Sequence, residues 1–205
     1  MSERKTEWLV FGGLAATIIT IFGAFVFFPA RDKPPPIYGT LPDFTLTDQN
    51  NQEITLATLR GNVCIADVIF TRCAGQCLLM SASMREIQAA LPAPLPINLV
   101  SLTTDPAYDT PVVLKKYGAR YDAQDGRWLF LTGDKAALHH TTVDGLKLAA
   151  VEKTPADQEN ASDLFIHSTK LVLIDKEGRI RGYFDGDSRE SVAQAIAAAK
   201  DLARQ

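Results

Sequence analysis

Three patterns in the sequence predict that the chain folds as an α/β sandwich. Residues 63–70 form a nearly continuous apolar run, which is typical of a central strand that is buried on both faces. Helix-like and strand-like patterns alternate from there to residue 131. Two short apolar runs around a turn at residues 175–178 then precede a final amphipathic segment at residues 189–202. This order of elements favours helices packed against a sheet.

The size and composition of the chain exclude several classes of protein. The chain has 205 residues, of which 46% are apolar and 22% are charged, as in an ordinary folded domain. Its formal net charge is −3, and no basic stretch is interleaved with aromatic residues, which argues against a nucleic-acid partner. Three cysteines are too few for a disulfide scaffold. Without its first 30 residues, the chain is long enough for one hydrophobic core.

The N-terminal part of the chain is predicted to be a membrane anchor and a tether. Residues 8–30 contain no charged side chain, and a helix of this length reaches about 34 Å, enough to cross ~30 Å of hydrocarbon. A cleaved signal peptide is the rival interpretation, but its apolar region is usually about 7–15 residues long and ends at a small-residue cleavage site. Two basic residues flank each end of the run, so charge alone does not orient it. We expect a short tail at residues 1–7, a transmembrane anchor at residues 8–30, a proline-rich spacer at residues 31–39 and one folded domain at residues 40–205.

The first half of the domain is predicted to contain a hairpin, two strands and a helix. Apolar and polar residues alternate on both sides of a turn at residues 49–52, which predicts an N-terminal hairpin. The central strand at residues 63–70 follows, and a second strand is expected at residues 97–102. Between them, four apolar residues recur at helical spacing and predict a buried helix face: Met80, Met84, Ile87 and Leu91.

The second half of the domain has a clear helix start. Thr110 and Pro111 are the residue types of an N-cap and a first-turn proline, and the helix is expected to run to about residue 118. Gly178 supplies the positive φ of a hairpin turn. The other expected elements are a strand at residues 128–131, a short helix at residues 135–140, strands at residues 171–174 and 180–184, and a closing helix at residues 189–202.

Two cysteines after the central strand are the candidate reactive groups. Cys73 precedes a predicted helix and Cys77 lies in or near its first turn, where unpaired N–H groups, the helix dipole and the charge of Arg72 favour thiolate. Residues four apart on a helix have Cβ atoms ~5–6 Å apart, whereas a disulfide needs ~3.5–4.5 Å. That spacing suits a metal ion held by two thiolates, but Gly75 permits a non-helical loop and therefore a disulfide. Two inert, buried cysteines are the third interpretation.

One histidine is a candidate third ligand. His167 lies just before a predicted strand, and by itself it would be interpreted as a surface or hydrogen-bonded histidine. Together with two thiolates, its imidazole favours copper, with zinc as the alternative metal. The adjacent His139 and His140 are expected to be solvated, because neighbours on a helix point in different directions. Cys64, inside the apolar run, is expected to be a small buried residue.

Two aspartates are candidate supporting residues. Asp67 places a carboxylate inside the predicted central strand, so it either faces a polar partner or accepts a proton from the thiols with a raised pKa. Asp105 follows the neighbouring strand, where it either lies near the cysteines or is an ordinary turn residue before Pro106. Active groups in open α/β sheets lie beyond the carboxyl ends of the strands, which is where both cysteines are placed.

Several motifs, found in order within residues 40–203, make the chain resemble the Sco/SenC family. The motifs are Phe70-Thr71-Arg72-Cys73 with Cys77, Thr104-Asp105-Pro106 with Asp109-Thr110-Pro111, Trp128 with Thr132-Gly133, His167-Ser168-Thr169, and Asp175 with Gly178. The resemblance implies a thioredoxin-like three-layer sandwich with an N-terminal hairpin, preceded by one transmembrane helix. It also implies that the domain lies on the outer face of the cytoplasmic membrane.

The same resemblance implies a copper metallochaperone, and it leaves open a thiol–disulfide oxidoreductase activity of the redox-active pair Cys73 and Cys77. Cys73, Cys77 and His167 are the implied copper ligands, and Asp105 is an implied outer-shell group. Copper, as Cu(I) or Cu(II), would pass to the cytochrome c oxidase subunit that carries the CuA centre. An upstream copper donor and a thiol reductant are further implied partners. Asp67 stands six residues before Cys73, the spacing of a buried aspartate in thioredoxins.

The chain departs from the family pattern after each cysteine. Ala74 and Leu78 stand where the family usually has prolines that stiffen the loop, whereas the implied ligands are retained. A thiol–disulfide reductase that acts on cysteines of a partner protein is the second hypothesis, because it needs the same thiol pair. A structural or sensing domain with incidental thiols is the third.

Overall fold

The computed structural model of the protein describes residues 36–154 and 165–205. The predicted tail at residues 1–7, the predicted anchor at residues 8–30 and the spacer up to residue 35 lie outside these ranges. Among the residues that are described, no helix has the length and apolar character that a membrane crossing requires.

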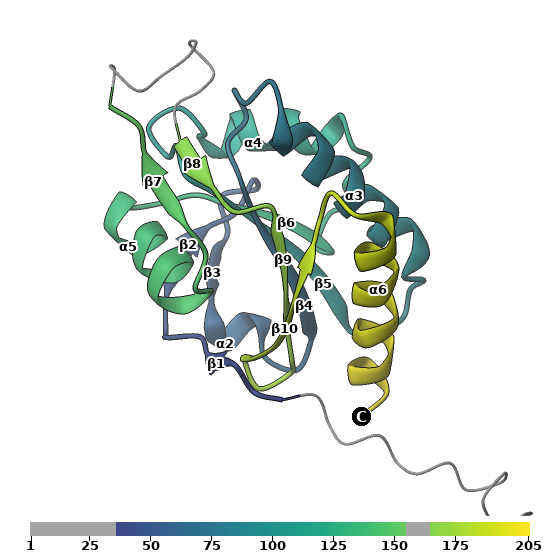
Figure 1. Cartoon of the computed structure of the whole chain (residues 1–205). Helices are drawn as coiled ribbons and strands as arrows, with labels where there is room; N and C mark the ends of the chain where they lie inside the picture. The colour runs from purple at the N-terminus through teal and green to yellow at the C-terminus, as the bar shows by residue number, and fades with distance from the viewer. Residues whose placement is uncertain (1–35, 155–164) are drawn as a thin grey trace, which may run out of the picture. The chain divides into compact units, whose positions relative to one another are not determined.

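The centre of the domain is a six-stranded sheet with the strand order β1-β10-β9-β4-β5-β6 (Figure 1). β4, β5 and β6 pair in parallel, whereas β9, β10 and β1 extend the sheet by antiparallel pairing. The five predicted strands of the sheet are confirmed, and their observed bounds are β4 Val63–Ile69, β5 Ile97–Thr103, β6 Trp128–Leu131, β9 Lys170–Ile174 and β10 Arg179–Asp185. The sixth strand, β1 Gly39–Thr40, was not predicted.

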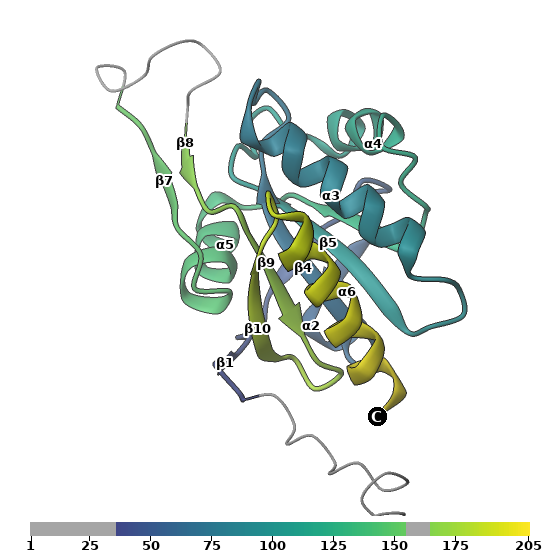
Figure 2. The ribbon, with the colours of Figure 1, turned by 45° about the vertical axis from the view of Figure 1, so that its right-hand side comes forward.

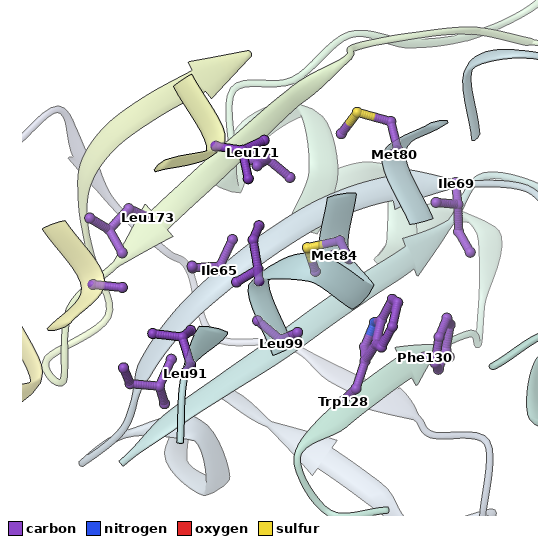
Figure 3. Packing of buried hydrophobic residues seen from close by; sticks show 14 of the residues in the cluster. Ile65, Ile69, Met80, Met84, Leu91, Leu99, Trp128, Phe130, Leu171 and Leu173 are labelled. Atoms are coloured by element: carbon purple, nitrogen blue, oxygen red, sulfur yellow. The ribbon is translucent and has the colours of Figure 1, made fainter. Parts of the chain in front are cut away.

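Three helices contribute to the apolar cluster on one face of this sheet: α3 Gln76–Ala90, α4 Pro111–Ala119 and α6 Arg189–Arg204. α3 and α6 lie side by side (Figure 2). The predicted apolar stripe of α3, including Met80 and Met84, is buried in the cluster that also contains Trp128 and Phe130 of β6 (Figure 3). Both methionines are therefore core residues, as their helical spacing predicted.

The opposite face of the sheet has its own apolar cluster, which makes the domain a three-layer sandwich. Alternate residues of β4 enter the two clusters: Ile65 and Ile69 face α3, whereas Cys64, Ala66 and Val68 face the other layer. The predicted N-terminal hairpin is confirmed on this second side. The elements here are β2 Thr45–Thr47, β3 Glu53–Thr55, α2 Leu56–Leu59, α5 Lys135–His139 and the π-helix η1 His140–Gly145.

The π-helix η1 and a small separate ribbon were not predicted. η1 continues α5, and Leu146 N–H donates to Thr141 O at 2.8 Å, five residues back. The ribbon is an antiparallel pair of β7 Ala150–Glu152 and β8 Phe165–His167, which extends beyond the main sheet (Figures 1 and 2). Neither element has a periodic apolar pattern, which is the signal that identifies longer helices and strands in a sequence.

The ends of two elements differ from their predicted form. Tyr38 N–H donates to Ile180 O at 2.9 Å and Gly39 pairs with Ile180, so the sheet includes a residue that the sequence assigned to the spacer. Thr110 is the N-cap residue of α4, as predicted, but its side chain makes no capping hydrogen bond.

Gly118 is a buried helical glycine at which added volume has no room. A Cβ there would lie 2.7 Å from Phe130 Cε2, and Phe130 cannot easily retreat because its ring stacks on Trp128 with centroids 4.9 Å apart. Alanine gains up to about 1 kcal/mol in helix propensity, but overpacking costs about 1–3 kcal/mol. We therefore expect Gly118→Ala to lower the free energy of unfolding by about 1–2 kcal/mol in urea denaturation.

Gly39→Ala is the matched control for this prediction. A Cβ at Gly39 meets only Ile180 Cδ1, at 3.7 Å, which is an ordinary contact. Its unfolding free energy should stay within about 0.5 kcal/mol of the unsubstituted protein. A Gly118→Ala protein that is more stable than the original would show that the helix propensity outweighs the contact.

Candidate metal and redox centre

The two candidate cysteines lie together at the carboxyl edge of the parallel strands. β4 ends at Ile69, and Cys73 sits in the following loop, partly exposed, whereas Cys77 is buried in the first turn of α3. Phe70 ties both cysteines to the strand end: its carbonyl accepts from Cys73 N–H at 3.2 Å, and its N–H donates to Cys77 Sγ at 3.5 Å. The two thiols also share a hydrogen bond, and no disulfide joins the cysteines.

The pKa of the Cys77 thiol is raised, contrary to the expectation of a thiolate at a helix start. The hydrogen bond to Cys73 raises it most, since this bond uses the thiol proton, and burial raises it further. The N–H of Phe70 acts in the opposite direction, and the negative charges of Cys73 and Asp67 add smaller increases. Cys77 is therefore the member of the pair that holds its proton more firmly than a free thiol does, and Cys73 is the more exposed member.

Asp67 lies within β4, completely buried, on the face of the sheet that α3 covers. Ser101 Oγ donates to Asp67 Oδ1 at 2.5 Å, and Trp128 Nε1 donates to Ser101 Oγ at 3.0 Å. A polar partner for this carboxylate, one of the two interpretations, is therefore present. Its other interpretation, as an acceptor for a proton from the thiols, stays a hypothesis, although its charge acts on Cys77.

Asp105 contacts the residue that precedes Cys73. Arg72 donates to Asp105 Oδ2 from Nε at 3.1 Å and from Nη2 at 2.5 Å, and the Arg72 guanidinium lies 4.4 Å from the centre of the Tyr108 ring. The Asp105 side chain is 9% exposed, so this ion pair is partly shielded from water. Asp105 thus lies beside the cysteine loop, and it offsets the positive charge that Arg72 was expected to offer to the thiols.

Asp109 is a site residue to which the sequence gave no role beyond a helix start and a place in a family motif. It is fully buried, and its carboxylate accepts from Thr71 N–H at 3.1 Å and from the hydroxyls of Thr71 and Thr103. Burial raises the pKa of Asp109 above its ordinary value, and the three hydrogen bonds only partly offset this. Its position four residues after Asp105, at the edge that carries the cysteines, is the one sequence signal that pointed to it.

The remaining candidate residues are three histidines and the third cysteine. His167 is the last residue of β8 and its backbone pairs with Ala150, but its imidazole lies outside the described side chains. Among the described residues, no three His, Cys, Asp or Glu side chains gather to hold a metal ion. His139 and His140 are exposed, as predicted, and His140 Nδ1 lies 2.9 Å from Asp144 Oδ2. Cys64 is buried in the other layer, and burial raises its pKa to about 12.

The domain that carries this thiol pair has relatives among known proteins. The SCO1/SenC family matches residues 34–203, which is most of the chain. The chain belongs to the SCO1/SenC family. It is 31% identical over 156 residues to the SCO1 protein homolog of Bacillus subtilis (strain 168), a match that covers 75% of this chain and 77% of that protein.

Solved SCO1/SenC structures agree with the fold. BsSco, a member of the Sco family of cytochrome c oxidase assembly proteins in which a disulfide switch is identified, is similar with a TM-score of 0.71 and 28% identity, over 84% of this chain and 97% of BsSco. ScoI of Bradyrhizobium japonicum with copper bound has a TM-score of 0.67 and 22% identity, over 80% of this chain and 99% of ScoI. The predicted thioredoxin-like α/β fold is therefore confirmed for the described domain.

Proposed function

We propose that this SCO1/SenC protein binds copper and delivers it to the CuA centre of cytochrome c oxidase. Cys73 and Cys77 are the two sulfur ligands and His167 is the third ligand. The observation that carries this proposal is the pair of reduced, hydrogen-bonded thiols at the carboxyl edge of β4. Copper-bound ScoI and the oxidase-assembly role of the Sco family that includes BsSco support the choice of metal and acceptor.

The chemistry of the pair suits a soft cation as cargo. Thiolate ligands favour Cu(I), and an added imidazole also accommodates Cu(II). Binding requires that both thiols lose their protons, and Cys77, whose pKa is raised, holds its proton most firmly. Asp67 acts on Cys77 through its charge, and we propose it as the acceptor for that proton.

The unequal exposure of the sulfurs gives a route for transfer. Cys73 is partly exposed and Cys77 is buried, so an incoming thiol or imidazole of an acceptor reaches the Cys73 side first. Exchange of ligands one at a time then moves the ion without releasing it into water. In this proposal, the anchor at residues 8–30 holds the domain at the outer face of the cytoplasmic membrane, close to its acceptor.

A second function has its own observation in favour of it. The two thiols are close enough to share a hydrogen bond, which is the arrangement that a thiol–disulfide reductase needs. The thiolate of Cys73 would attack a partner disulfide to form a mixed disulfide and release one partner thiolate. Attack by the thiolate of Cys77 would then release the second partner thiolate and leave a Cys73–Cys77 disulfide, so two electrons pass to the partner.

The role of His167 separates the two functions. We expect His167→Ala to weaken one-to-one Cu(II) binding by about tenfold or more, because it removes a ligand rather than an outer-shell partner, whose loss already costs about 10- to 100-fold. Binding is measured on the reduced full-length chain in detergent by competition with a chelator. Reduction of a disulfide-containing test peptide should be unchanged in the same variant.

His140→Ala is the matched control for His167→Ala. It removes an exposed imidazole that pairs with Asp144 in η1, and it should alter neither measurement. Equal copper affinity in the His167→Ala and unsubstituted proteins, with peptide reduction retained, would favour the reductase over the copper chaperone.

A further inference from the structure

Residues 104–109 contact two consecutive residues, Thr71 and Arg72, in the loop that carries Cys73. Asp109 accepts two hydrogen bonds from Thr71, one from its N–H at 3.1 Å and one from its hydroxyl. Asp105 pairs with Arg72, the next residue and the one directly before Cys73. The contacts join segments 33 to 38 residues apart in the sequence.

Residues 104–109 are themselves firmly held. Thr104 N–H donates to Ile69 O at 2.9 Å, which ties the stretch to the end of β4. Asp109 N–H donates to Asp105 O at 2.8 Å, and Thr103 Oγ1 accepts from Asp105 N–H at 2.9 Å. The two carboxylates that meet the cysteine loop therefore project from a braced turn rather than from a loose loop.

The contacts of Asp105 and Asp109 with the cysteine loop differ in strength. The Asp105–Arg72 pair involves an arginine whose side chain is 40% exposed, so water and salt weaken it. Asp109 is 0% exposed and receives three hydrogen bonds, and hydrogen bonds to a buried carboxylate are among the stronger ones in proteins. Asp109 is thus the stronger of the two anchors.

We propose that Asp109 is a positioning residue for the thiol pair: through Thr71 it holds the chain before Cys73 so that the reduced Cys73 stays beside Cys77. This inference rests on the proposed function only in taking the two cysteines as the reactive pair. The loop has glycine at position 75 and no proline after either cysteine, so its own residues restrict its backbone little and contacts from outside the loop matter more.

The contact between Asp109 and Thr71 should favour the dithiol over the disulfide, because it is made in the structure with reduced cysteines. In the structure, Cys73 N–H donates to Phe70 O, and a hydrogen bond joins the two thiols. Closing a disulfide replaces this hydrogen bond with a covalent S–S bond of ~2.0 Å at a narrow torsion angle, so the two thiols must change their relative position. The Asp109–Thr71 contact stabilises the loop in its present conformation and so opposes that change. Removing the contact should therefore make the disulfide more stable relative to the dithiol.

The test is the dithiol–disulfide equilibrium with glutathione, measured without copper on the full-length chain in detergent. One glutathione disulfide oxidises the Cys73–Cys77 dithiol and yields two glutathione thiols, so electrons and protons balance. We expect Asp109→Asn and Thr71→Val to raise the equilibrium constant for protein disulfide formation by about three- to tenfold, the fold-change that one net hydrogen bond is worth. The double variant should show no more than about the larger single effect, because both changes act on the same contact between the Thr71 hydroxyl and the Asp109 carboxylate.

Two control variants separate positioning from general stability. Thr71→Ser keeps both donors to Asp109 and should leave the equilibrium unchanged. Asp175→Asn removes a buried carboxylate in the β9–β10 turn, at the opposite edge of the sheet, and should lower the melting temperature without shifting the equilibrium. Should Asp109→Asn not fold, Thr71→Val against Thr71→Ser carries the comparison alone.

The possible outcomes either support the inference or overturn it. An equal equilibrium constant for Thr71→Val, Thr71→Ser and the unsubstituted protein would overturn it, even with copper binding intact. A shift of the equilibrium toward the dithiol in Asp109→Asn and Thr71→Val would also overturn it, because the contact would then favour the disulfide. Failure of the unsubstituted protein to bind copper would instead count against the proposed function, since copper takes no part in this measurement.

Discussion

Replacing Cys73 or Cys77 with serine is expected to abolish tight one-to-one copper binding. A hydroxyl stays protonated at neutral pH and is a hard, weak ligand for Cu(I), so each variant retains only one thiolate. We expect the affinity for Cu(I) to fall by at least about 10³-fold, which corresponds to about 4 kcal/mol. The measurement is competition with a Cu(I) chelator, made on the reduced full-length chain in detergent.

The control for these variants is Cys64→Ala. Cys64 belongs to the apolar cluster on the other face of the sheet, so its removal should leave the copper affinity unchanged although it removes a thiol. Melting temperatures should show that Cys73→Ser, at a partly exposed position, folds as the original does. Tight binding that survives both Cys73→Ser and Cys77→Ser, but not Cys64→Ala, would place the copper site in the wrong layer and end the proposal.

Asp175→Ala is expected to cause the largest loss of stability among the changes considered. Asp175 is 4% exposed and accepts from Arg181 Nη1 and from Arg179 Nε, each at 2.8 Å. Arg181 is itself 7% exposed, so the substitution removes the carboxylate that faces a buried guanidinium. Breaking a buried ion pair by removing one partner typically costs about 3–5 kcal/mol, and we expect a loss of that size in urea denaturation at pH 7.

This loss should depend on pH in a defined direction. Burial raises the pKa of Asp175, but hydrogen bonds from Arg181 and Arg179 outweigh it, so the pKa is lowered in the folded protein. A lowered pKa means that the carboxylate stabilises the fold above its unfolded pKa of about 3.9 and that this contribution is lost as the pH falls through the folded value. The difference between Asp175→Ala and the original should therefore be largest near neutral pH and shrink below about pH 4.

Arg85→Ala is the matched control for the buried pair. Arg85 and Asp122 also form an ion pair, at 2.5 Å, but their side chains are 58% and 70% exposed. Exposed pairs contribute about 0–1 kcal/mol, so this variant should be nearly as stable as the original. A loss for Asp175→Ala that is no larger than for Arg85→Ala, or that persists undiminished in acid, would contradict the assignment of Asp175.

The elements with a periodic apolar pattern were predictable from the sequence. β4 was recognised because residues 63–70 are nearly all apolar, and α3 because Met80, Met84 and Ile87 repeat at helical spacing. The thiol pair was equally accessible, since Cys73 and Cys77 are close in the chain and the helix start lies between them. The π-helix η1 was not, because a π-turn differs from an α-turn only in which carbonyl each N–H reaches.

The sequence by itself determined the order of the strands and helices that have a clear apolar pattern, the family and the cysteine pair, because each depends on residues near one another in the chain. Only the tertiary structure decided what surrounds that pair. It placed β5 beside β4, which brought Asp105 to Arg72 and Asp109 to Thr71. It also joined Cys77 to Cys73 by a hydrogen bond and buried Cys77, so that the pKa of Cys77 rises rather than falls. Local patterns reflect backbone geometry within a few residues, whereas burial and long-range hydrogen bonds depend on which strands become neighbours in the sheet.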